Sequence, residues 1–318
     1  MASASTSVAA ALTALSGCDF LSSADVSAEQ TAALLQLAVQ LKHGDRRIDL
    51  GNRVLGLIFT KASTRTRVSF QVAMARLGGQ TVDLNPQVTQ LGRGEPLEDT
   101  ARVLSRFCDV LAIRTFAQQE LADYAHWASI PVINALTDLE HPCQALADFL
   151  TMQEAFGDLQ GQTLAYVGDG NNVAHSLMLC GALLGVNVRI GCPEGFEPLP
   201  GVVDQARSLA VHGAQISVTT DPVEAVRGAQ ALYTDVWASM GQEQEQAERE
   251  RAFQGFCLNE DLLAEADPRA IVLHCLPAHR GEEISAGVME GPSSRIFDQA
   301  ENRLHAQQAL LAALLGGL

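Results

Sequence analysis

Residues 60–71 read TKASTRTRVSFQ and lie where a predicted strand ends and a predicted helix begins. The apolar run Val54–Phe59 precedes them and is typical of a buried strand. Apolar residues after them recur at helical spacing until Gly78 and Gly79 end the pattern. A strand that runs directly into a helix is the repeating unit of α/β folds, so this stretch predicts a parallel sheet.

The same stretch has the composition of an anion-binding site. The N-terminus of a helix presents free backbone N–H groups and a partial positive charge. Here it coincides with three hydroxyl groups and three cations, which are Ser63, Thr64, Thr66, Lys61, Arg65 and Arg67. An ordinary helix cap with solvated charges is the alternative. We favour a phosphate or phosphate-like dianion, because the three cations fall within seven residues of an otherwise acidic chain.

Composition narrows the class of protein. The chain has 318 residues, 47% of them hydrophobic, which favours two globular domains of ordinary size. Its formal net charge of −16 argues against general binding to nucleic acid or to an anionic membrane. No segment approaches the roughly 20 apolar residues of a membrane span. Seven cysteines without CxxC spacing indicate neither a disulfide framework nor a structural metal site, and they favour the cytoplasm.

Strand and helix patterns alternate along the chain in two series. The expected strands lie near 54–59, 80–84, 110–113 and 131–134, and then near 163–167, 187–191, 215–218, 231–236 and 271–274. This alternation predicts an α/β protein with two doubly wound parallel-sheet domains, residues 19–150 and 151–318, and an active site in the crevice between them. Residues 1–18 lack the basic start of a signal peptide and are interpreted as a flexible extension. The last helical pattern, 298–315, is expected to pack back on the first domain.

Polar motifs follow the strands of the first series, at the sheet edge where ligands bind in such folds. Arg114 comes directly after a strand, where a buried guanidinium needs an anionic or carbonyl partner; a salt bridge between domains is the alternative. His141 and Gln144 flank Pro142 at a helix start and could hydrogen-bond one small polar group, or only cap the helix. The Gly-rich loop that contains Gln90 is either mobile surface or an active-site lid.

A glycine-rich turn follows the first strand of the second series. Gly168 and Gly170 resemble the start of a dinucleotide fingerprint, but Val173 stands in place of the third glycine. Asn171 and Asn172 put polar side chains where the backbone would approach a pyrophosphate. We therefore expect Asn172 to bind the carboxylate or amine of a small ligand, and we keep a nucleotide as the alternative.

Two more strands of this series end in polar residues. Asp235 could bind an ammonium group, or cap the following helix. His274 and Cys275 together raise metal binding or thiol catalysis, but adjacent residues of a strand point to opposite faces, so we expect no metal. We expect Cys275 to line the substrate, with backbone contacts from Leu276. Arg303 lies on the apolar last helix, where an arginine normally reaches the surface.

Taken together, these motifs resemble those of the aspartate/ornithine carbamoyltransferase family. Residues 63–67 and 141–144 are similar to the carbamoyl-phosphate motifs that the whole family shares. Residues 168–172, 235–242 and 274–277 are similar to the set found in members that use ornithine. The five motifs occur in the family's order, and the resemblance covers nearly all of the chain after residue 18.

The resemblance implies transfer of the carbamoyl group of carbamoyl phosphate to the δ-amine of ornithine, without a metal or cofactor, in a cytoplasmic homotrimer. The catalytic residues that it implies are Arg114, His141, Asp235 and Cys275. The residues that it implies for carbamoyl phosphate are Ser63, Thr64, Arg65, Thr66, Arg67, Gln90, Arg114, His141, Pro142, Cys143, Gln144, Cys275, Leu276 and Arg303. Those that it implies for ornithine are Asn172, Asp235, Ser239 and Met240. Gln90 would reach the site of a neighbouring subunit.

Other functions stay open at this stage. A member that uses aspartate would need cations for the second carboxylate of its substrate, where this chain offers Asp235 and the loop after it. Putrescine and N-acetylornithine are further possible acceptors. A binding protein without catalysis would be expected to lack at least one of Arg65, Arg114 and His141, and all three are present. A nucleotide-dependent enzyme would need a dinucleotide on the 168–172 turn.

Overall fold

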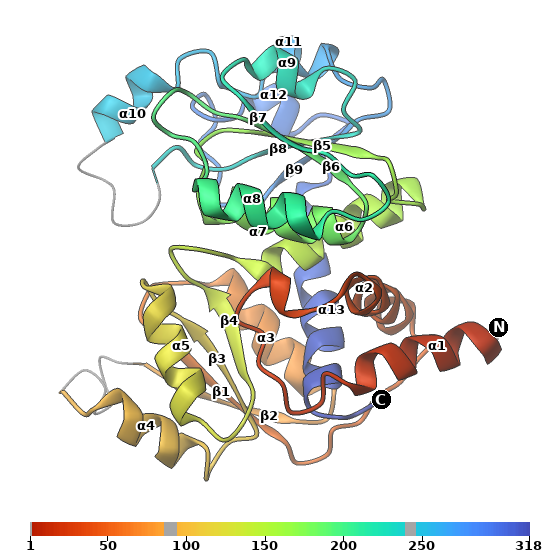
Figure 1. Cartoon of the computed structure of the whole chain (residues 1–318), viewed down its shortest axis with the longest axis vertical. Helices are drawn as coiled ribbons and strands as arrows, with labels where there is room; N and C mark the ends of the chain where they lie inside the picture. The colour runs from red at the N-terminus through yellow and green to blue at the C-terminus, as the bar shows by residue number, and fades with distance from the viewer. Residues whose placement is uncertain (1, 86–93, 239–245) are drawn as a thin grey trace. The chain divides into compact units, whose positions relative to one another are not determined.

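The computed structural model describes residues 2–85, 94–238 and 246–318, and the chain divides into two compact units. The first unit comprises residues 1–150 and 302–318, and the second comprises residues 151–301. Each unit contains one parallel sheet with helices packed around it (Figure 1). Among the helices in the described ranges, none is long and apolar enough to cross a membrane.

The first unit is built on a four-stranded parallel sheet. Its strands, in spatial order, are β2 (Gln80–Leu84), β1 (Val54–Phe59), β3 (Val110–Arg114) and β4 (Val132–Leu136). β1 and β3 are buried along almost their whole length and are rich in Val, Leu and Ile, as a parallel sheet covered by helices requires. The strand order reverses between β1 and β3, so the residues that follow these two strands lie at a switch point, where ligands bind in open α/β sheets.

The helices around this sheet follow the expected pattern. They are α2 (Ala28–His43), α3 (Arg65–Arg76), α4 (Leu97–Leu104), α5 (Gln118–Trp127), the first part of α6 (Pro142–Phe156) and the larger part of α13 (Ile296–Leu314), with the short 3-10 turn η1 (Ser23–Asp25) before α2. α2 begins after Ser27, whose side chain accepts from Gln30 N–H, and it ends at Gly44 with a positive φ of 76°.

The N-terminal residues differ from the flexible extension that we expected for residues 1–18. A helix, α1 (Ala2–Thr13), packs against α2, and Leu12 and Leu15 are buried. Gly17 N–H donates to the carbonyl oxygen of Leu314 at 2.9 Å. Helix propensity alone does not stabilise an isolated helix of 12 residues, so burial of these leucines supplies the tertiary contact that the sequence pattern did not reveal.

The second unit is built on a five-stranded parallel sheet. Its strands, in spatial order, are β7 (Ile216–Thr219), β6 (Asn187–Gly191), β5 (Thr163–Val167), β8 (Ala231–Thr234) and β9 (Ile271–His274). Its helices are α7 (Asn172–Leu183), α8 (Pro200–Leu209), α9 (Pro222–Val226), α10 (Gln246–Ala252), α11 (Glu260–Ala264) and α12 (Ala286–Met289). The strand order reverses between β5 and β8, which makes their carboxyl ends the switch point of this sheet.

The expected fold class is confirmed. The nine expected strands all occur in the described part of the chain, with ends within two residues of the predicted ones. Every pairing between them is parallel. The polar motifs therefore follow strands whose carboxyl ends lie at the binding edge of each sheet.

Candidate active site

The residues expected to bind the donor phosphate collect at the switch point of the first sheet. α3 begins directly after the turn that follows β1, and Thr64 before it makes no side-chain cap bond. Ser63 Oγ accepts from Thr66 N–H at 3.3 Å and lies 3.5 Å from Arg114 Nη1. Arg114 ends β3 and is only 6% exposed. A buried guanidinium beside a helix N-terminus is a favourable place for a dianion.

Arg303 is buried, although its place on an apolar helix is more typical of a surface arginine. Its Nη2 donates to Thr66 Oγ1 at 2.7 Å, and its Nη1 donates to Gln144 Oε1 at 2.8 Å. Side chains of α3, α6 and α13 thus meet at one guanidinium. Because Thr66 Oγ1 accepts from Arg303, the hydroxyl proton of Thr66 is directed elsewhere and is available for a ligand.

Gln144 uses both ends of its amide inside the protein. While its oxygen accepts from Arg303, its Nε2 donates to Asp148 Oδ1 at 2.7 Å. These two hydrogen bonds orient the Gln144 amide, and its second N–H is compatible with the contact to the carbamoyl group that we expected. Sequence reasoning missed Asp148; its spacing of four residues from Gln144 on one helix was the signal that could have found it.

His141 lies immediately before α6 and is only 4% exposed. Burial lowers the pKa of His141 well below its usual value of 6.5, and the charges of Arg303, Arg114 and Arg65 lower it further. The imidazole is therefore neutral at physiological pH, with one nitrogen that donates and one that accepts. Such a ring can hydrogen-bond an uncharged carbamoyl group without adding a positive charge.

We expect His141 to make stability depend on pH. Because its pKa is lowered in the fold, the unfolded chain binds a proton below about pH 6.5 that the folded chain does not. The free energy of unfolding should then fall as the pH drops below about 6.5, by up to about 1.4 kcal/mol per pH unit. Above this pH the ring is neutral in both states, so His141 adds no pH dependence. Thermal unfolding of the wild type and of His141→Gln on both sides of this pH measures the effect. His126→Gln changes an exposed histidine of the same unit and is the control. If stability fell equally with decreasing pH in the wild type and in His141→Gln, the prediction for His141 would be wrong.

Two expected donor residues point to other groups. Arg67 forms an ion pair with Asp83 in β2, and its guanidinium lies 4.9 Å from the centroid of the Phe59 ring. Cys143 is buried, and its thiol donates to the carbonyl oxygen of Asn134 at 3.4 Å. Burial raises the pKa of Cys143 to about 12, so the thiol is neutral. Both contacts are structural ones that sequence spacing could not show.

The remaining residues that we expected to bind the phosphate donor lie in both units and outside the described ranges. Thr64 and Arg65 are exposed at the start of α3, and Pro142 is the first residue of α6. Cys275 and Leu276 belong to the second unit. Gln90 lies outside the described residues.

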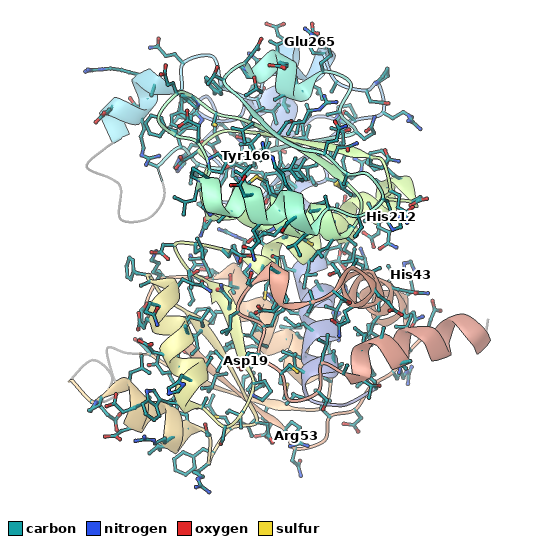
Figure 2. The ribbon with its side chains drawn as sticks, in the orientation of Figure 1. Asp19, His43, Arg53, Tyr166, His212 and Glu265 are labelled. Carbon is teal, nitrogen blue, oxygen red and sulfur yellow. The ribbon has the colours of Figure 1, made fainter. Side chains whose placement is uncertain are left out.

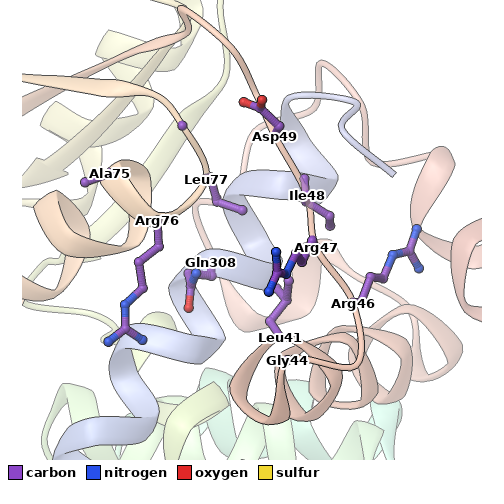
Figure 3. Close-up of a pocket in the computed structure, with 11 residues that line it drawn as sticks. Leu41, Gly44, Arg46, Arg47, Ile48, Asp49, Ala75, Arg76, Leu77 and Gln308 are labelled. Atoms are coloured by element: carbon purple, nitrogen blue, oxygen red, sulfur yellow. The ribbon is translucent and has the colours of Figure 1, made fainter.

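The first unit also contains a pocket of about 560 Å³ at the C-terminal ends of α2 and α3. Arginines, leucines and Gln308 are among the residues that line it. Figure 3 shows that the guanidinium groups of Arg46, Arg47 and Arg76 point in different directions. A small anion needs donors that converge on it, so this pocket does not have the geometry of an anion site.

In the second unit, the expected acceptor residues meet at the switch point between β5 and β8. Asp235 follows β8, and its Oδ1 accepts from Cys275 Sγ at 2.9 Å and from Val236 N–H at 2.8 Å. Its Oδ2 accepts from Asn171 Nδ2 at 3.1 Å. Groups that follow β5, β8 and β9 therefore converge on one carboxylate, which is only 6% exposed.

The glycine-rich turn after β5 is closed to a dinucleotide. A Cβ on Gly170 would lie 2.2 Å from Pro198 N, and Gly170 N–H donates to Phe196 O at 2.8 Å. The chain itself thus occupies the space where a pyrophosphate would approach the glycine. Asn172, an expected acceptor ligand, is the first residue of α7. The two expected acceptor residues that lie outside the described part of the chain are Ser239 and Met240.

His274 and Cys275 lie closer to one carboxylate than strand geometry led us to expect. Their ligand atoms and that of Asp235 are within 4.8 Å of one another, and β9 ends at His274, so Cys275 lies outside the strand. His274 Nδ1 accepts from Leu276 N–H at 2.8 Å, and Nε2 lies 3.1 Å from Glu283 Oε1. Both ring nitrogens are engaged by the protein, so a metal at His274 would displace one of these hydrogen bonds.

Arg249 is a buried cation that the sequence did not distinguish from the charged run around it. Its Nη1 donates to Asp169 Oδ2 at 2.7 Å and to the carbonyl oxygen of Trp237 at 2.8 Å. Its guanidinium lies 5.1 Å from the centroid of the Phe196 ring. Arg249 therefore joins α10 to the glycine-rich turn and to the segment after β8, which both carry expected acceptor residues.

Replacing Arg249 by methionine should destabilise the second unit by about 3–5 kcal/mol, because the Asp169 carboxylate would stay buried without the cation that neutralises it. The Asp169 side chain is 12% exposed, so water would screen it poorly. Urea-induced unfolding gives the measurement. Arg251→Met changes an exposed arginine of the same helix and serves as the control. Equal loss of stability in the two variants would contradict the assignment.

Comparison with known proteins places both units in one family. The family model "Aspartate/ornithine carbamoyltransferase, carbamoyl-P binding domain" matches residues 18–154. The model "Aspartate/ornithine carbamoyltransferase, Asp/Orn binding domain" matches residues 160–314. Together they cover all five motifs that the sequence analysis singled out.

Relatives and solved structures agree with these matches. The chain is 86% identical to an ornithine carbamoyltransferase of Prochlorococcus marinus (strain MIT 9313) over 98% of each chain, and 83% identical to one of Parasynechococcus marenigrum (strain WH8102) over 100% of each. Ornithine carbamoyltransferase from Pyrococcus furiosus superposes with a TM-score of 0.91 at 49% identity, over 96% of this chain and 99% of that one. Ornithine carbamoyltransferase from Gloeobacter violaceus superposes with a TM-score of 0.86 at 57% identity, over 94% of this chain and 98% of that one. The chain belongs to the aspartate/ornithine carbamoyltransferase family.

Proposed function

We propose that the chain transfers the carbamoyl group of carbamoyl phosphate to the δ-amine of ornithine, giving citrulline and phosphate. The observation that carries this proposal is the Asp235 carboxylate, which is held between Asn171 and Cys275. A buried carboxylate attracts the α-ammonium group of ornithine and repels the second carboxylate of aspartate. The relatives named above, which carry the name ornithine carbamoyltransferase, support the same acceptor.

The donor would be bound by the first unit. The N-terminus of α3, with Ser63, Thr64 and Arg65, would hold the phosphate group, and Arg303 would orient Thr66 beside it. Arg114, Thr66 and the neutral His141 would face the carbamoyl oxygen. These groups are buried, so their hydrogen bonds to a ligand would be stronger than in water.

The proposed reaction is an addition followed by an elimination. The δ-amine must first lose the proton that it carries below its usual pKa of about 10.4, and must lie about 3–3.5 Å from the carbamoyl carbon. Its lone pair then forms the C–N bond, and the carbonyl oxygen becomes an oxyanion. The oxyanion then re-forms the carbonyl as the C–O bond to phosphate breaks, the phosphate leaves with the electron pair, and the nitrogen gives its second proton to that phosphate or to water. Each well-placed donor to the oxyanion contributes about 3–4 kcal/mol.

An assay of acceptors tests this function. Citrulline formation from carbamoyl phosphate and ornithine is compared with product formation from aspartate, putrescine and N-acetylornithine. We expect turnover with ornithine and little with the other three. Absence of product from ornithine would contradict the proposal. The cytoplasm as location stays a prediction.

We also propose that the chain assembles with two further copies into a homotrimer. Val68 and Val72 of α3 and Val82 of β2 are 50%, 37% and 45% exposed, and α3 packs against β2. Among the strands in the described ranges, β2 lies at an edge of its sheet, and exposed apolar residues beside an edge strand are typical of a surface that another chain covers. The resemblance implied a trimer in which Gln90 serves a neighbouring site, so this surface is assigned to a second copy.

Light scattering should give the mass of three copies of the 33.9 kDa chain. Val72→Lys should weaken this assembly and lower activity with it, because a lysine side chain disfavours burial in an apolar interface. Val103→Lys, at a valine of α4 that is 47% exposed, is the matched control and should leave the mass unchanged. A fully active monomeric wild type would contradict the trimer.

A further inference from the structure

We propose that Asn171 is a positioning residue for the acceptor site, which orients the Asp235 carboxylate through its side-chain amide. This inference rests on the proposed function, because Asp235 is the group that would receive the α-amino group of ornithine. The family motif directed attention to the next residue, Asn172. The hydrogen bonds of the structure single out Asn171.

The orientation of the Asn171 amide is dictated by α7. Asn171 is the N-cap of this helix, and its Oδ1 accepts from Val173 N–H at 2.9 Å and from Ala174 N–H at 3.2 Å. Two backbone donors require an acceptor, so the oxygen must face the helix and the nitrogen must face away from it. The nitrogen then lies 3.1 Å from Asp235 Oδ2. The same side chain therefore accepts from the helix and donates to the carboxylate.

Only one of the common N-cap residues can do both. Serine, threonine and aspartate cap a helix about as well as asparagine. Serine and threonine have a single oxygen on a short side chain, and an ionised aspartate has no donor. A cap requirement alone would thus not specify asparagine at position 171. The second hydrogen bond, to Asp235, provides the physical reason for the amide.

A buried tyrosine also contacts the amide oxygen of Asn171. The Tyr166 hydroxyl donates to Asn171 Oδ1 at 3.4 Å, and its ring stacks on Tyr233 at a centroid distance of 5.8 Å. Tyr166, labelled in Figure 2, is fully buried in β5. Burial raises the pKa of Tyr166 well above 10, and nearby Asp235, Asp169, Cys275 and Cys192 raise it further, so the hydroxyl remains a donor.

Hydrogen bonds to both oxygens of Asp235 fix the orientation of its carboxylate. Its Oδ1 is held by Cys275 Sγ and by Val236 N–H, and its Oδ2 is held by Asn171. Oδ1 already accepts two hydrogen bonds and Oδ2 accepts one, so one lone pair of Oδ2 remains for an amine or ammonium of the substrate. Preorganisation of this kind avoids the cost of ordering the group during binding.

The test keeps the helix cap and removes the donor. Asn171→Asp retains an N-cap oxygen but places a second carboxyl group beside Asp235, and Asn171→Ser retains a cap without the donor or the charge. Steady-state kinetics with both substrates, pH profiles of kcat/KM and thermal unfolding are measured for each. Asn259→Asp is the matched control, because Asn259 caps α11 in the same unit by accepting from Leu262 N–H.

We expect both Asn171 variants to raise the KM for ornithine by about 10- to 100-fold, the range for a hydrogen bond to a charged group. The KM for carbamoyl phosphate should stay close to that of the wild type, and so should the melting temperature of Asn171→Ser. Asn171→Asp should lower the melting temperature at neutral pH, because two adjacent carboxyl groups destabilise the fold. In Asn171→Asp the acid limb of the profile should also move to higher pH, because two adjacent carboxyl groups do not both ionise readily. Asn259→Asp should change none of these quantities.

Comparison of the Asn171 variants with Asp235→Asn distinguishes a failure of the role of Asn171 from a failure of the proposed acceptor site. Normal ornithine KM and an unmoved pH profile in Asn171→Asp would overturn the positioning role and leave only a helix cap. Loss of activity that follows loss of thermal stability in both Asn171 variants would overturn it as well. If Asp235→Asn itself uses ornithine normally, the proposed acceptor site is wrong. If Asp235→Asn fails and the Asn171 variants do not, only the inference about Asn171 is wrong.

Discussion

Arg114→Ala should lower kcat by about 10²- to 10³-fold, the loss typical of removing one donor that stabilises an oxyanion. Arg114 ends β3, is buried, and lies 3.5 Å from Ser63 Oγ at the start of α3. We propose that its guanidinium donates to the carbamoyl oxygen, whose negative charge develops as the amine adds. A group that acts mainly in this intermediate should affect kcat more than the KM of either substrate.

Steady-state kinetics at saturating concentrations of both substrates measure this effect. Arg106→Ala, at an exposed arginine of the same unit, should retain wild-type turnover. Circular dichroism and thermal unfolding show whether the Arg114 variant is folded, and added guanidinium ion should restore part of its activity if the missing group is the cause. Turnover near that of the wild type in folded Arg114→Ala would refute the proposed role.

Asp235→Asn should lower kcat/KM for ornithine by about 10²- to 10³-fold, within the range for truncating one partner of a buried charged pair. The change keeps the shape of the side chain and removes its negative charge, so the α-ammonium group of ornithine would lose its counter-charge. It also leaves one acceptor oxygen in place of two, so either Asn171 Nδ2 or the pair of donors at Oδ1, Val236 N–H and Cys275 Sγ, loses its acceptor. The KM for carbamoyl phosphate should change little, because the donor residues belong to the first unit.

Initial rates with each substrate varied in turn measure this separation. Asp204→Asn, at an exposed aspartate of α8, removes the same charge from the second unit and should behave like the wild type. An Asp235→Asn variant that has lost affinity for carbamoyl phosphate but not for ornithine would contradict the assignment of the acceptor site.

The parallel sheets were predictable because their signal is local. A buried strand such as β1 is a continuous apolar run, and its turn into α3 is marked by hydroxyl residues and then by helical spacing. Strand ends agreed within two residues for the same reason. The N-terminal helix α1 was missed because its stability depends on leucines that are buried against other parts of the chain, and no local pattern records that burial.

The positions of the site residues were predictable from the sequence, but the directions of their side chains were not. The donor motif at the start of α3 and the carboxylate after β8 followed from residue type and strand position. The direction of each side chain did not: Arg67 turns to Asp83, and Cys143 donates to a backbone carbonyl. Both positions are adjacent in sequence to residues at the proposed donor site, so proximity along the chain was a poor guide to the group that each side chain contacts.

The sequence alone determined the two α/β units, the family resemblance and the residue types of a donor and an acceptor site. These depend on hydrophobic periodicity and on the order of short motifs, which are properties of neighbouring residues. Only the folded chain decides that Arg303 reaches Thr66, that Arg249 neutralises Asp169, and that Asn171 donates to Asp235. Those partners are separated by 64 to 237 residues, and hydrogen bonds act over about 3 Å, so their pairing is a product of the fold.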